Sequence, residues 1–589
     1  MFGKIVYISD TIAHIAIKEG TPVAANLMNM HVVFEDEKKK ILGEVADIDE
    51  KIIKVNFLGE IVNGRFVGGV IRKPTLQANL RLITKEELGL IVGEEKVGSM
   101  LLGHSPLYDD CPIRVDINDL FSNHMAIFGN TGSGKSCGVA RIMQNLFNSP
   151  NFIPYRSNFF IFDAYGEYHN AFKDINKINP NYNFKFYTTN KQADPKNYLR
   201  IPLWLLGVDD FALLLGAETH SQLPIIERML KLVAIFATNN EMANDYKNHL
   251  IAKAIMTILY TNQTAPSKRN DVFAILATCS TPQFNLEAEV QGIGYTRKFR
   301  DCFIIDTAGN FPESNLMTEY VSSFINDKLD TYEAKTTNYY TLEDLEKALE
   351  FTLISEGLLR NEKTANEAVT LKVRLHSLTI GENSDYLRYP NYITLEQYIA
   401  SLISIEGNKK AQIINFNLED VDDTFAKVVT KIYTKMLFDF TKRLKNRASI
   451  PFHIFLEESH RYVQNDSDKF LLGYNIFDRV AKEGRKYGLI FNLISQRPVE
   501  ISETVISQCS NFIIFKMNHP RDLEYIEKML PNISAEIVEK QKSLQPGTCV
   551  AFGKSFKVPM IIKLEMPNPE PSSSNCDVVN TWQVQAKQQ

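Results

Sequence analysis

The chain has 589 residues, of which 44% are hydrophobic and 23% charged, a composition ordinary for a globular protein of about three or four domains. Its 65 Lys and Arg against 70 Asp and Glu give a formal net charge of −5, which argues against a basic surface that attracts nucleic acid everywhere. A protein that lines an internal pore with Lys and Arg while its outer surface is acidic is still compatible with that net charge.

The cysteine pattern and the first residues bear on the compartment. The seven cysteines are scattered without a CxxC pair, so the sequence predicts neither a zinc site nor a disulfide framework. Their odd number suits a reducing environment, and the opening stretch "MFGKIVYISDTIAHIAIKEG" lacks the apolar core of a secretory signal. No uncharged apolar run approaches the roughly 18 residues of a membrane span. We therefore expect a cytoplasmic protein without membrane association.

The N-terminal region is predicted to be rich in β-strands. Four segments with many β-branched residues are separated by charged turns, namely "GKIVYISDTIAHIAI", "MHVVFEDE", "KILGEVADID" and "KIIKVNFLGEIV". Strands at this spacing suggest a small barrel or sandwich.

From residue 113 onward, apolar runs alternate with helical stretches. "HMAIFGN", "NFFIFD", "PFHIFLEE" and "GLIFNLISQ" are short and apolar, whereas stretches such as "QLPIIERMLKLVAIFATNN" carry apolar residues at three- and four-residue steps. Buried strands that alternate with helices are typical of a parallel sheet. The predicted fold class is therefore α/β.

These patterns divide the chain into five predicted parts. Residues 1–90 form the N-terminal β-barrel, and residues 91–204 and 406–565 are two parts of one α/β core. Residues 205–405 are a largely helical insertion between them. Residues 566–589 are polar and rich in Pro and Ser, which predicts a flexible tail or an arm that orders only on a neighbouring chain.

The sequence "GNTGSGKS" at residues 129–136 matches the phosphate-binding pattern G-x-x-x-x-G-K-[ST]. It follows an apolar strand and precedes a predicted helix, which is the context that the pattern requires. Lys135 is expected to reach the β- and γ-phosphate oxygens of a nucleotide, and the Ser136 hydroxyl to hold Mg²⁺. The predicted nucleotide contacts in this loop are Gly129, Asn130, Thr131, Gly132, Ser133, Gly134, Lys135, Ser136 and Cys137.

A phosphate-loop enzyme also needs carboxylates at a nearby strand end, and two stretches compete for this role. "CFIIDTAGN" contains Asp306 and is similar to the switch of a GTPase, but the chain lacks a downstream N-K-x-D for reading guanine. We interpret Asp306 as a strand-end residue. "HIFLEESHRY" ends an apolar strand with Glu457 and Glu458. We assign Glu457 to the Mg²⁺ shell, partly through water, and Glu458 to positioning the attacking water. The pocket requires 453–458 and 129–136 to meet across adjacent strands.

Two further features suit a motor. "GLIFNLISQRP" ends in Gln496, which is a candidate sensor of the γ-phosphate beside the acidic pair. The preceding stretch "FDRVAKEGRKYG" offers Arg479 and Arg485 as residues that could neutralise transition-state charge in a neighbouring subunit, and Arg485 is preferred. A solvated basic face or a DNA-facing loop is the alternative for this stretch.

In order, "HMAIFGNTGSGKS", "FIFDAYGEY", "IPLWLL", "FLEESHRY", "AKEGRKYGLIFNLISQRP", "VISQCSNFIIFKM" and "PGTCVAFG" resemble the HerA-type ATPases, hexameric DNA translocases related to FtsK. The resemblance spans roughly residues 1–565. It implies a RecA-like core, a barrel used for assembly and partner docking, Lys135 and Ser136 as phosphate and magnesium residues, and Glu458 as catalytic acid. It also implies Asp163 and Glu167 as an additional acidic motif near the nucleotide, Gln496 as sensor and Arg485 as trans-acting arginine. The double Glu, where many relatives have Asp-Glu, and the long insertion depart from the family pattern.

The resemblance predicts a function in DNA processing. We expect a homohexamer that hydrolyses ATP with Mg²⁺ at subunit boundaries and translocates double-stranded DNA through its pore. A NurA-like nuclease or a sirtuin-type NADase is the expected effector, in DNA end resection or in bacterial anti-phage defence. The alternatives are a nucleotide-binding scaffold ring that activates an effector without unwinding DNA, a GTPase switch, and a secretion or conjugation ATPase.

Overall fold

The chain folds into two compact units. The first comprises Met1–Asn197, Ile399–Asp466 and Ile476–Gln589, and the second comprises Tyr198–Tyr398 and Ser467–Asn475. The computed structural model describes residues 2–18, 27–36, 39–330, 339–355, 362–407, 409–466, 468–529, 540–572 and 578–582. Within these ranges, no helix combines the length and the apolar character needed to cross a membrane.

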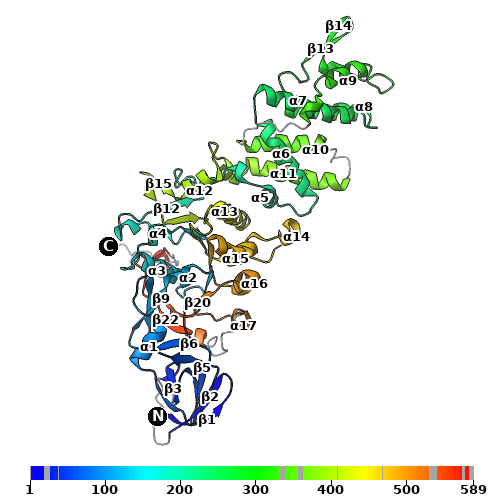
Figure 1. Cartoon of the computed structure of the whole chain (residues 1–589). Helices are drawn as coiled ribbons and strands as arrows, with labels where there is room; N and C mark the ends of the chain where they lie inside the picture. Colours follow the sequence, from blue (N-terminus) through cyan, green and yellow to red (C-terminus); the bar gives the residue numbers. More distant parts are fainter. Residues whose placement is uncertain are drawn as a thin grey trace, which may run out of the picture. The chain divides into compact units, whose positions relative to one another are not determined.

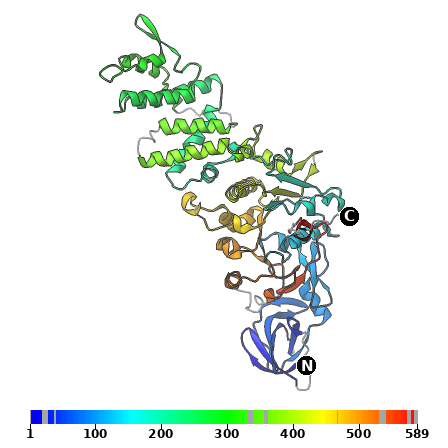
Figure 2. The same cartoon turned by 180° about the vertical axis from the view of Figure 1, so that it is seen from behind.

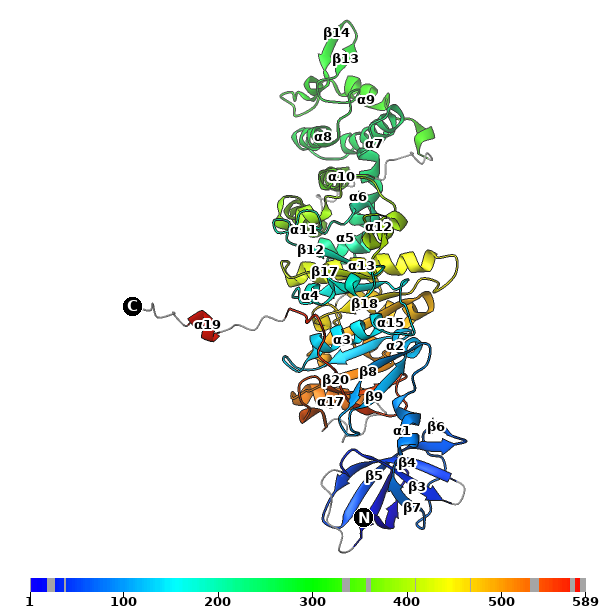
Figure 3. The same ribbon diagram turned by 90° about the vertical axis from the view of Figure 1, so that its left-hand side faces the viewer.

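The predicted N-terminal strands form one antiparallel sheet in the order β1-β2-β5-β4-β3-β7, with β6 paired to β5 (Figure 3). Its core is made by alternate apolar side chains such as Ile15, Phe34 and Val55, which are almost fully buried. In the described part of the chain no pairing joins β1 to β7, so this sheet is a half-barrel. The strands are β1 (Phe2–Ile8), β2 (Ile12–Ile17), β3 (His31–Asp36), β4 (Lys39–Ile48), β5 (Ile52–Val62), β6 (Arg65–Gly68) and β7 (Asn79–Leu82).

An eleven-stranded sheet in the order β12-β17-β11-β18-β19-β10-β20-β21-β22-β8-β9 forms the core of the first unit (Figure 1). Neighbours are parallel from β12 to β20 and antiparallel from β20 to β9. The predicted α/β fold with a parallel sheet is therefore confirmed. The strands are β8 (Ser99–Ser105), β9 (Cys111–Asp116), β10 (Met125–Phe128), β11 (Phe159–Asp163), β12 (Phe184–Thr188), β17 (Ile413–Asn417), β18 (Phe452–Leu456), β19 (Leu489–Ser495), β20 (Asn511–Phe515), β21 (Thr548–Gly553) and β22 (Met560–Lys563).

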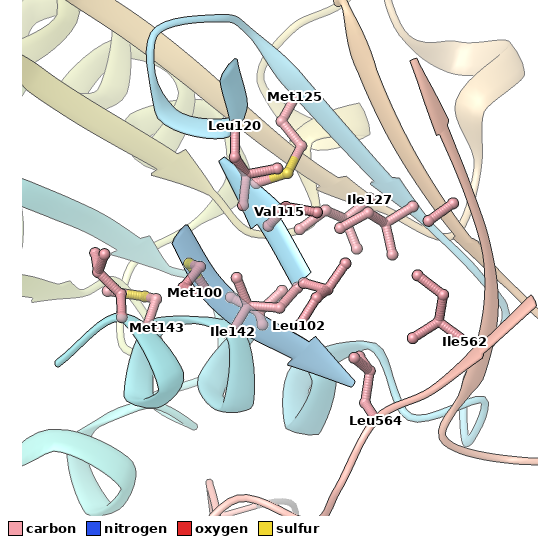
Figure 4. Packing of buried hydrophobic residues seen from close by; sticks show 14 of the residues in the cluster. Met100, Leu102, Val115, Leu120, Met125, Ile127, Ile142, Met143, Ile562 and Leu564 are labelled. Atoms are coloured by element: carbon pink, nitrogen blue, oxygen red, sulfur yellow. The ribbon is translucent and has the colours of Figure 1, made fainter. Parts of the chain in front are cut away.

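Helices cover this sheet because their apolar faces match its buried strands. Ile142 and Met143 of α3 join Met100 and Leu102 of β8 in one buried cluster, which also contains Ile562 (Figure 4). This packing fixes the helix that follows the phosphate loop. The helices of the first unit are α1 (Lys85–Val92), α2 (Ile117–Phe121), α3 (Lys135–Phe147), α4 (His169–Phe172), α13 (Asp423–Arg443), α15 (Ile476–Tyr487), α16 (Glu503–Ser507), α17 (Pro520–Met529) and α19 (Val578–Trp582). Helix α12 (Leu395–Ile403) joins the two units in sequence.

The second unit is mainly helical, and α6, α10 and α11 pack side by side within it (Figure 2). It also contains a two-stranded hairpin, β13 (Glu289–Gly292) and β14 (Tyr295–Lys298). Its helices are α5 (Val208–Leu214), α6 (Gln222–Phe236), α7 (Glu241–Leu259), α8 (Ala265–Cys279), α9 (Ser314–Ser322), α10 (Leu342–Ser355), α11 (Glu362–Ile380) and α14 (Asp468–Leu472).

Asp306 does not end a strand, so that interpretation was wrong. It lies in the second unit, in an exposed turn after a short 3₁₀ segment, Phe299–Phe303. Its Oδ1 accepts hydrogen bonds from the backbone N–H groups of Ala308 and Asn310, each at 2.9 Å. Cys302 and Phe303 of the run "CFII" are buried within this unit, whereas Ile304 is exposed. The run therefore does not enter the sheet, and Asp306 caps a turn.

Candidate active site

Four strand ends meet at one edge of the central sheet. The strands β11, β18, β19 and β10 are consecutive parallel neighbours, so their carboxyl ends lie together. Asp163 is the last residue of β11, Glu457 follows β18, Gln496 follows β19 and Gly129 follows β10. Residues that are far apart in the sequence are thereby brought to one crevice, as the predicted nucleotide site requires.

The strand that carries the acidic pair is not adjacent to the phosphate-loop strand, contrary to our expectation. β19 pairs with β18 on one side and with β10 on the other. Gln496 therefore lies between the acidic pair and the phosphate loop. The sequence contained no information on strand order, which is why this intermediate strand was missed.

The phosphate loop is held by the strands on both sides. The Gly129 N–H donates to the carbonyl of Ser495, and the Asn130 N–H donates to the carbonyl of Lys516. Gly134 has φ 97°, and a Cβ there would lie 2.9 Å from the backbone nitrogen of Gly547, so only glycine fits. Helix α3 begins at the next residue, and its free N–H groups point into the loop, which favours an anion.

A hydrogen-bonded chain links this loop to the acidic pair. Thr131 Oγ1 donates to Gln496 Oε1 at 2.6 Å, and Gln496 Nε2 donates to Glu458 Oε1 at 2.8 Å. The amide of Gln496 thus uses both of its ends, one toward the loop and one toward the carboxylate. A change at the loop can reach the carboxylate through this single side chain.

The backbone at Glu458 explains how two successive carboxylates differ in direction. Glu458 has φ 46° and ψ 47°, a left-handed conformation that is costly for a residue with a side chain. The chain therefore turns immediately after Glu457, whose N–H donates to the carbonyl of Phe162 on β11. Glu457 is directed toward β11, and Glu458 toward Gln496.

Burial and like charges perturb the titration of this cluster. Burial, with the negative charges of Asp163 and Glu167, raises the pKa of Glu457 well above its usual range. Burial also raises the pKa of Glu458, which the positive charge of Lys135 opposes. Burial lowers the pKa of Lys135, and the carboxylates of Glu458, Glu457 and Glu167 oppose that shift. Perturbed groups clustered in a crevice are typical of functional sites.

Asp163 organises the loop that follows β11. Its carboxylate accepts the backbone N–H groups of Glu167 and Tyr168 at 3.0 and 2.9 Å and the side-chain amide of Asn415 at 3.0 Å. The loop depends on Gly166, which has φ 70° and has Asn417 and Glu419 against the position of a Cβ. Asp163 is thus an internal anchor, and it turns Glu167 toward the phosphate loop.

Several oxygens in the site lack a hydrogen-bond partner. Among the described residues, Glu167 Oε2, Glu457 Oε2 and Glu458 Oε2 are buried and accept no hydrogen bond. Burial raises the pKa of Glu167, and a hydrogen bond with Ser136 opposes this. Hydroxyl and carboxylate oxygens are the ligands that Mg²⁺ prefers, so this donor set fits a nucleotide-bound Mg²⁺. No group of three or more His, Cys, Asp and Glu in the described ranges forms a metal site made by the protein alone.

The remaining loop residues have supporting positions. Ser133 Oγ donates to the carbonyl of Asn130 at 2.7 Å and so closes the loop. Gly132 has φ 74° at its tip. Cys137 lies half-buried in the first turn of α3, where burial raises the pKa of its thiol.

The structure does not bring the candidate arginines into the site of their own chain. Arg485 is exposed in the last turn of α15, just before β19 begins, whereas Gln496 follows the other end of that strand. A seven-residue strand spans about 23 Å, so the two residues lie at opposite edges of the sheet. Arg479 pairs with Glu483 at 3.9 Å and stacks on the ring of Phe438.

Two residues beside Glu458 were not among the predicted site residues. His460 Nδ1 lies 3.3 Å from Glu458 Oε2 and 3.1 Å from Ser495 Oγ, and burial lowers its pKa. Arg461 forms an ion pair with Asp423 and lies over the ring of Tyr165. Both residues follow the acidic pair closely in the sequence "EESHRY", which could have indicated that they lie near the site.

A cavity of about 620 Å³ borders the site on the side of β20. Asn130 and Thr131 of the phosphate loop and Gln496 line this cavity, and several of its other lining residues are charged. Its size lies within the range of small-molecule sites. The lining residues are Asn130, Thr131, Gln496, Arg497, Val499, Glu500, His519, Arg521 and Asp522.

Comparison with known proteins points to one family. Residues 96–278, which include the phosphate loop, match the sequence model described as "Helicase HerA, central domain". The "DNA double-strand break repair helicase HerA" of Saccharolobus solfataricus is 29% identical over 33% of this chain and 39% of the relative. The protein of the same name from Sulfolobus acidocaldarius is 21% identical over 94% of this chain and 91% of the relative.

VirB4 of Thermoanaerobacter pseudethanolicus superposes with a TM-score of 0.43 and 13% identity, covering 80% of this chain and 98% of that one. The likeness to HerA-type proteins comes from the sequence matches, which extend over most of the chain. The chain is similar in sequence to the HerA-type ATPases over most of its length.

Proposed function

We propose that the protein is an ATP-driven translocase of double-stranded DNA that works as a hexameric ring. The observation that carries this proposal is the chain of hydrogen bonds from Thr131 through Gln496 to Glu458. It couples the loop that would bind the phosphates to the carboxylate that would act on water. Such coupling is what a motor needs, because cleavage of the γ-phosphate must be transmitted to a moving element. Relatives described as DNA double-strand break repair helicases support DNA as the substrate.

In this proposal different residues of the chain bind the phosphates, orient the attacking water and detect the γ-phosphate. The loop N–H groups and Lys135 bind the phosphate oxygens and neutralise charge on the transferred phosphoryl group. Glu458 orients the attacking water and accepts its proton. Gln496 holds Glu458 in position and detects whether the γ-phosphate is present.

Ser136, with Glu457 and Glu167 nearby, would hold Mg²⁺ directly or through water. When bound, the ion would neutralise phosphate charge. Both glutamates are buried, but Glu457 differs from Glu458 because it faces Asp163. Its proposed contribution is to the outer coordination shell, where it also holds the end of β18 against β11.

The ring is proposed from the position of Arg485. Because this exposed side chain lies at the opposite sheet edge from its own Gln496, any contribution that it makes to hydrolysis would be at the site of another copy. A trans-acting arginine in other NTPases accelerates hydrolysis by about 10³–10⁵. Six copies around a central pore would let each Arg485 face the next phosphate loop.

We further propose that the N-terminal half-barrel docks an effector enzyme in the cytoplasm, a NurA-like nuclease or a sirtuin-type NADase. The ring would then take part in DNA processing or in anti-phage defence. The effector's catalytic activity would depend on the assembled ring.

The test is ATP turnover and mass of the purified protein, with and without linear double-stranded DNA. We expect a hexameric mass in the presence of ATP, ATPase activity that DNA stimulates, and loss of activity in Lys135→Ala. A monomer that hydrolyses ATP at its full rate would refute the ring. If DNA leaves the rate unchanged while the ring still activates an effector, the protein is a nucleotide-binding scaffold instead of a translocase.

A further inference from the structure

The segment 566–572, "MPNPEPS", binds helix α3 and the loop that carries Glu167, although its composition predicted a tail. Its prolines alternate with other residues, so only every second residue has a backbone N–H. Proline also restricts the unfolded chain, which lowers the entropic cost of ordering the segment. Pro567 and Pro571 are buried. The segment is therefore packed and preorganised.

Two side-chain amides bind its backbone. Gln144 of α3 accepts the N–H of Asn568 through Oε1 at 2.8 Å and donates through Nε2 to the carbonyl of Pro569 at 2.9 Å. Asn170 Nδ2 donates to the carbonyl of Glu570 at 2.9 Å. Gln144 is almost fully buried, and its amide satisfies a donor and an acceptor of the segment at once.

The far end of the segment binds Glu167 directly. The Ser572 N–H donates to the carbonyl of Glu167 at 2.8 Å, while the N–H of Glu167 donates to Asp163 at 3.0 Å. The backbone of Glu167 is thus held from both sides, by the internal anchor and by the C-terminal segment. Its side chain is the one that interacts with Ser136 of the phosphate loop.

We propose that residues 566–572 form a strap that positions Glu167 at the nucleotide site, and that Gln144 and Asn170 are positioning residues which act through it. This inference rests on the proposed nucleotide site and deepens it. Because α3 and the loop 163–170 are joined through the strap, nucleotide binding and strap attachment are reciprocally coupled. A partner that detaches the strap would weaken nucleotide binding.

The experiment compares full-length Asn170→Ala and Gln144→Glu with Asn176→Ala, a matched control at an exposed asparagine outside the strap contacts. Hydrogen exchange of the Glu167 and Tyr168 amides is measured without nucleotide. Since one hydrogen bond contributes a factor of about 2–10, we expect exchange about 3- to 10-fold faster in Asn170→Ala and unchanged in Asn176→Ala. Unchanged exchange in Asn170→Ala, or equal acceleration in the control, would overturn the strap.

Kinetics give the second readout. We expect the KM for ATP to rise about 3- to 10-fold in Asn170→Ala with kcat within twofold, and an ATP analogue to slow exchange of the Ser572 amide in the unaltered protein. A fall in kcat alone would contradict a positioning role. Asn170 is only half-buried, so its variant remains informative if the buried Gln144→Glu fails to fold. If the unaltered protein does not hydrolyse ATP, the proposed function fails, while the exchange measured without nucleotide still decides whether the strap holds Glu167.

Discussion

Replacing Glu458 with glutamine is expected to separate binding of the nucleotide from its hydrolysis. The Glu458 carboxylate is buried, accepts a hydrogen bond from Gln496 at 2.8 Å and lies near Lys135. The amide oxygen of the introduced glutamine can accept the same hydrogen bond, so the coupling chain and the loop conformation are preserved. The substitution removes the negative charge and the ability to accept a proton from water.

The loss of the proton acceptor slows hydrolysis, whereas the loss of the negative charge strengthens ATP binding. Loss of a general base lowers the rate of hydrolysis by about 10²–10⁴, or about 3–5 kcal/mol in the barrier. Loss of one negative charge beside the triphosphate removes repulsion of about 1–2 kcal/mol at an effective dielectric constant near 20, which tightens ATP binding about 5- to 30-fold. Glu458→Gln is therefore expected to bind ATP more tightly and to cleave it far more slowly.

The assays are phosphate release at saturating ATP and equilibrium titration with a fluorescent ATP analogue. Lys135→Ala is the contrasting variant, because it loses the cation that faces the phosphates and should lose affinity as well as turnover. Normal turnover in Glu458→Gln would refute the assignment of the catalytic carboxylate. Weaker ATP binding would refute the electrostatic account of the site.

Three other substitutions test separate features. Gly134→Ala should abolish binding of the ATP analogue while the circular dichroism spectrum stays unchanged, since its Cβ would meet the backbone of Gly547 at 2.9 Å; retained affinity would show that the loop can adjust. Glu457→Gln should raise the melting temperature relative to the unaltered protein at pH 8 but not at pH 5. The pKa of Glu457 is raised in the fold, so the protonated carboxyl stabilises the folded state at acid pH, and this stabilisation is lost as the pH rises through the raised pKa. A difference in melting temperature that does not change with pH would contradict this reasoning. Mixing Arg485→Ala with Lys135→Ala subunits should restore part of the ATPase activity, because some boundaries then combine an intact loop with an intact arginine; no restoration at any ratio would argue against a trans-acting role.

The strands and the phosphate loop could be predicted because their signals are local. The run "HMAIF" before the glycine-rich loop predicted β10 and the start of α3, and "HIFLEE" predicted β18 with its terminal carboxylates. The order of the strands could not be predicted, since it depends on pairing between segments hundreds of residues apart. For that reason β19 was not expected between the acidic pair and the loop.

Other features of the site were hidden because backbone conformation decides them. The left-handed turn at Glu458, which separates the directions of two adjacent carboxylates, leaves no trace in residue type. The contacts of the segment "MPNPEPS" depend on amides at Gln144 and Asn170, which are far away in sequence. Composition alone predicted a tail there, because Pro and Ser give the same signal in an anchored extended segment and in a free one.

The place of the helical unit in the chain has an evolutionary consequence. Most of the unit, Tyr198–Tyr398, lies in the single connection between β12 and β17, which are parallel neighbours at one margin of the sheet. Lengthening a closed loop tenfold, from roughly 20 to 200 residues, adds only about 2 kcal/mol of closure entropy. Descendants of one ancestral core could therefore gain, lose or exchange this helical unit without disturbing the strands of the site. The connection between β12 and β17 is thus a position where evolution can insert a new domain.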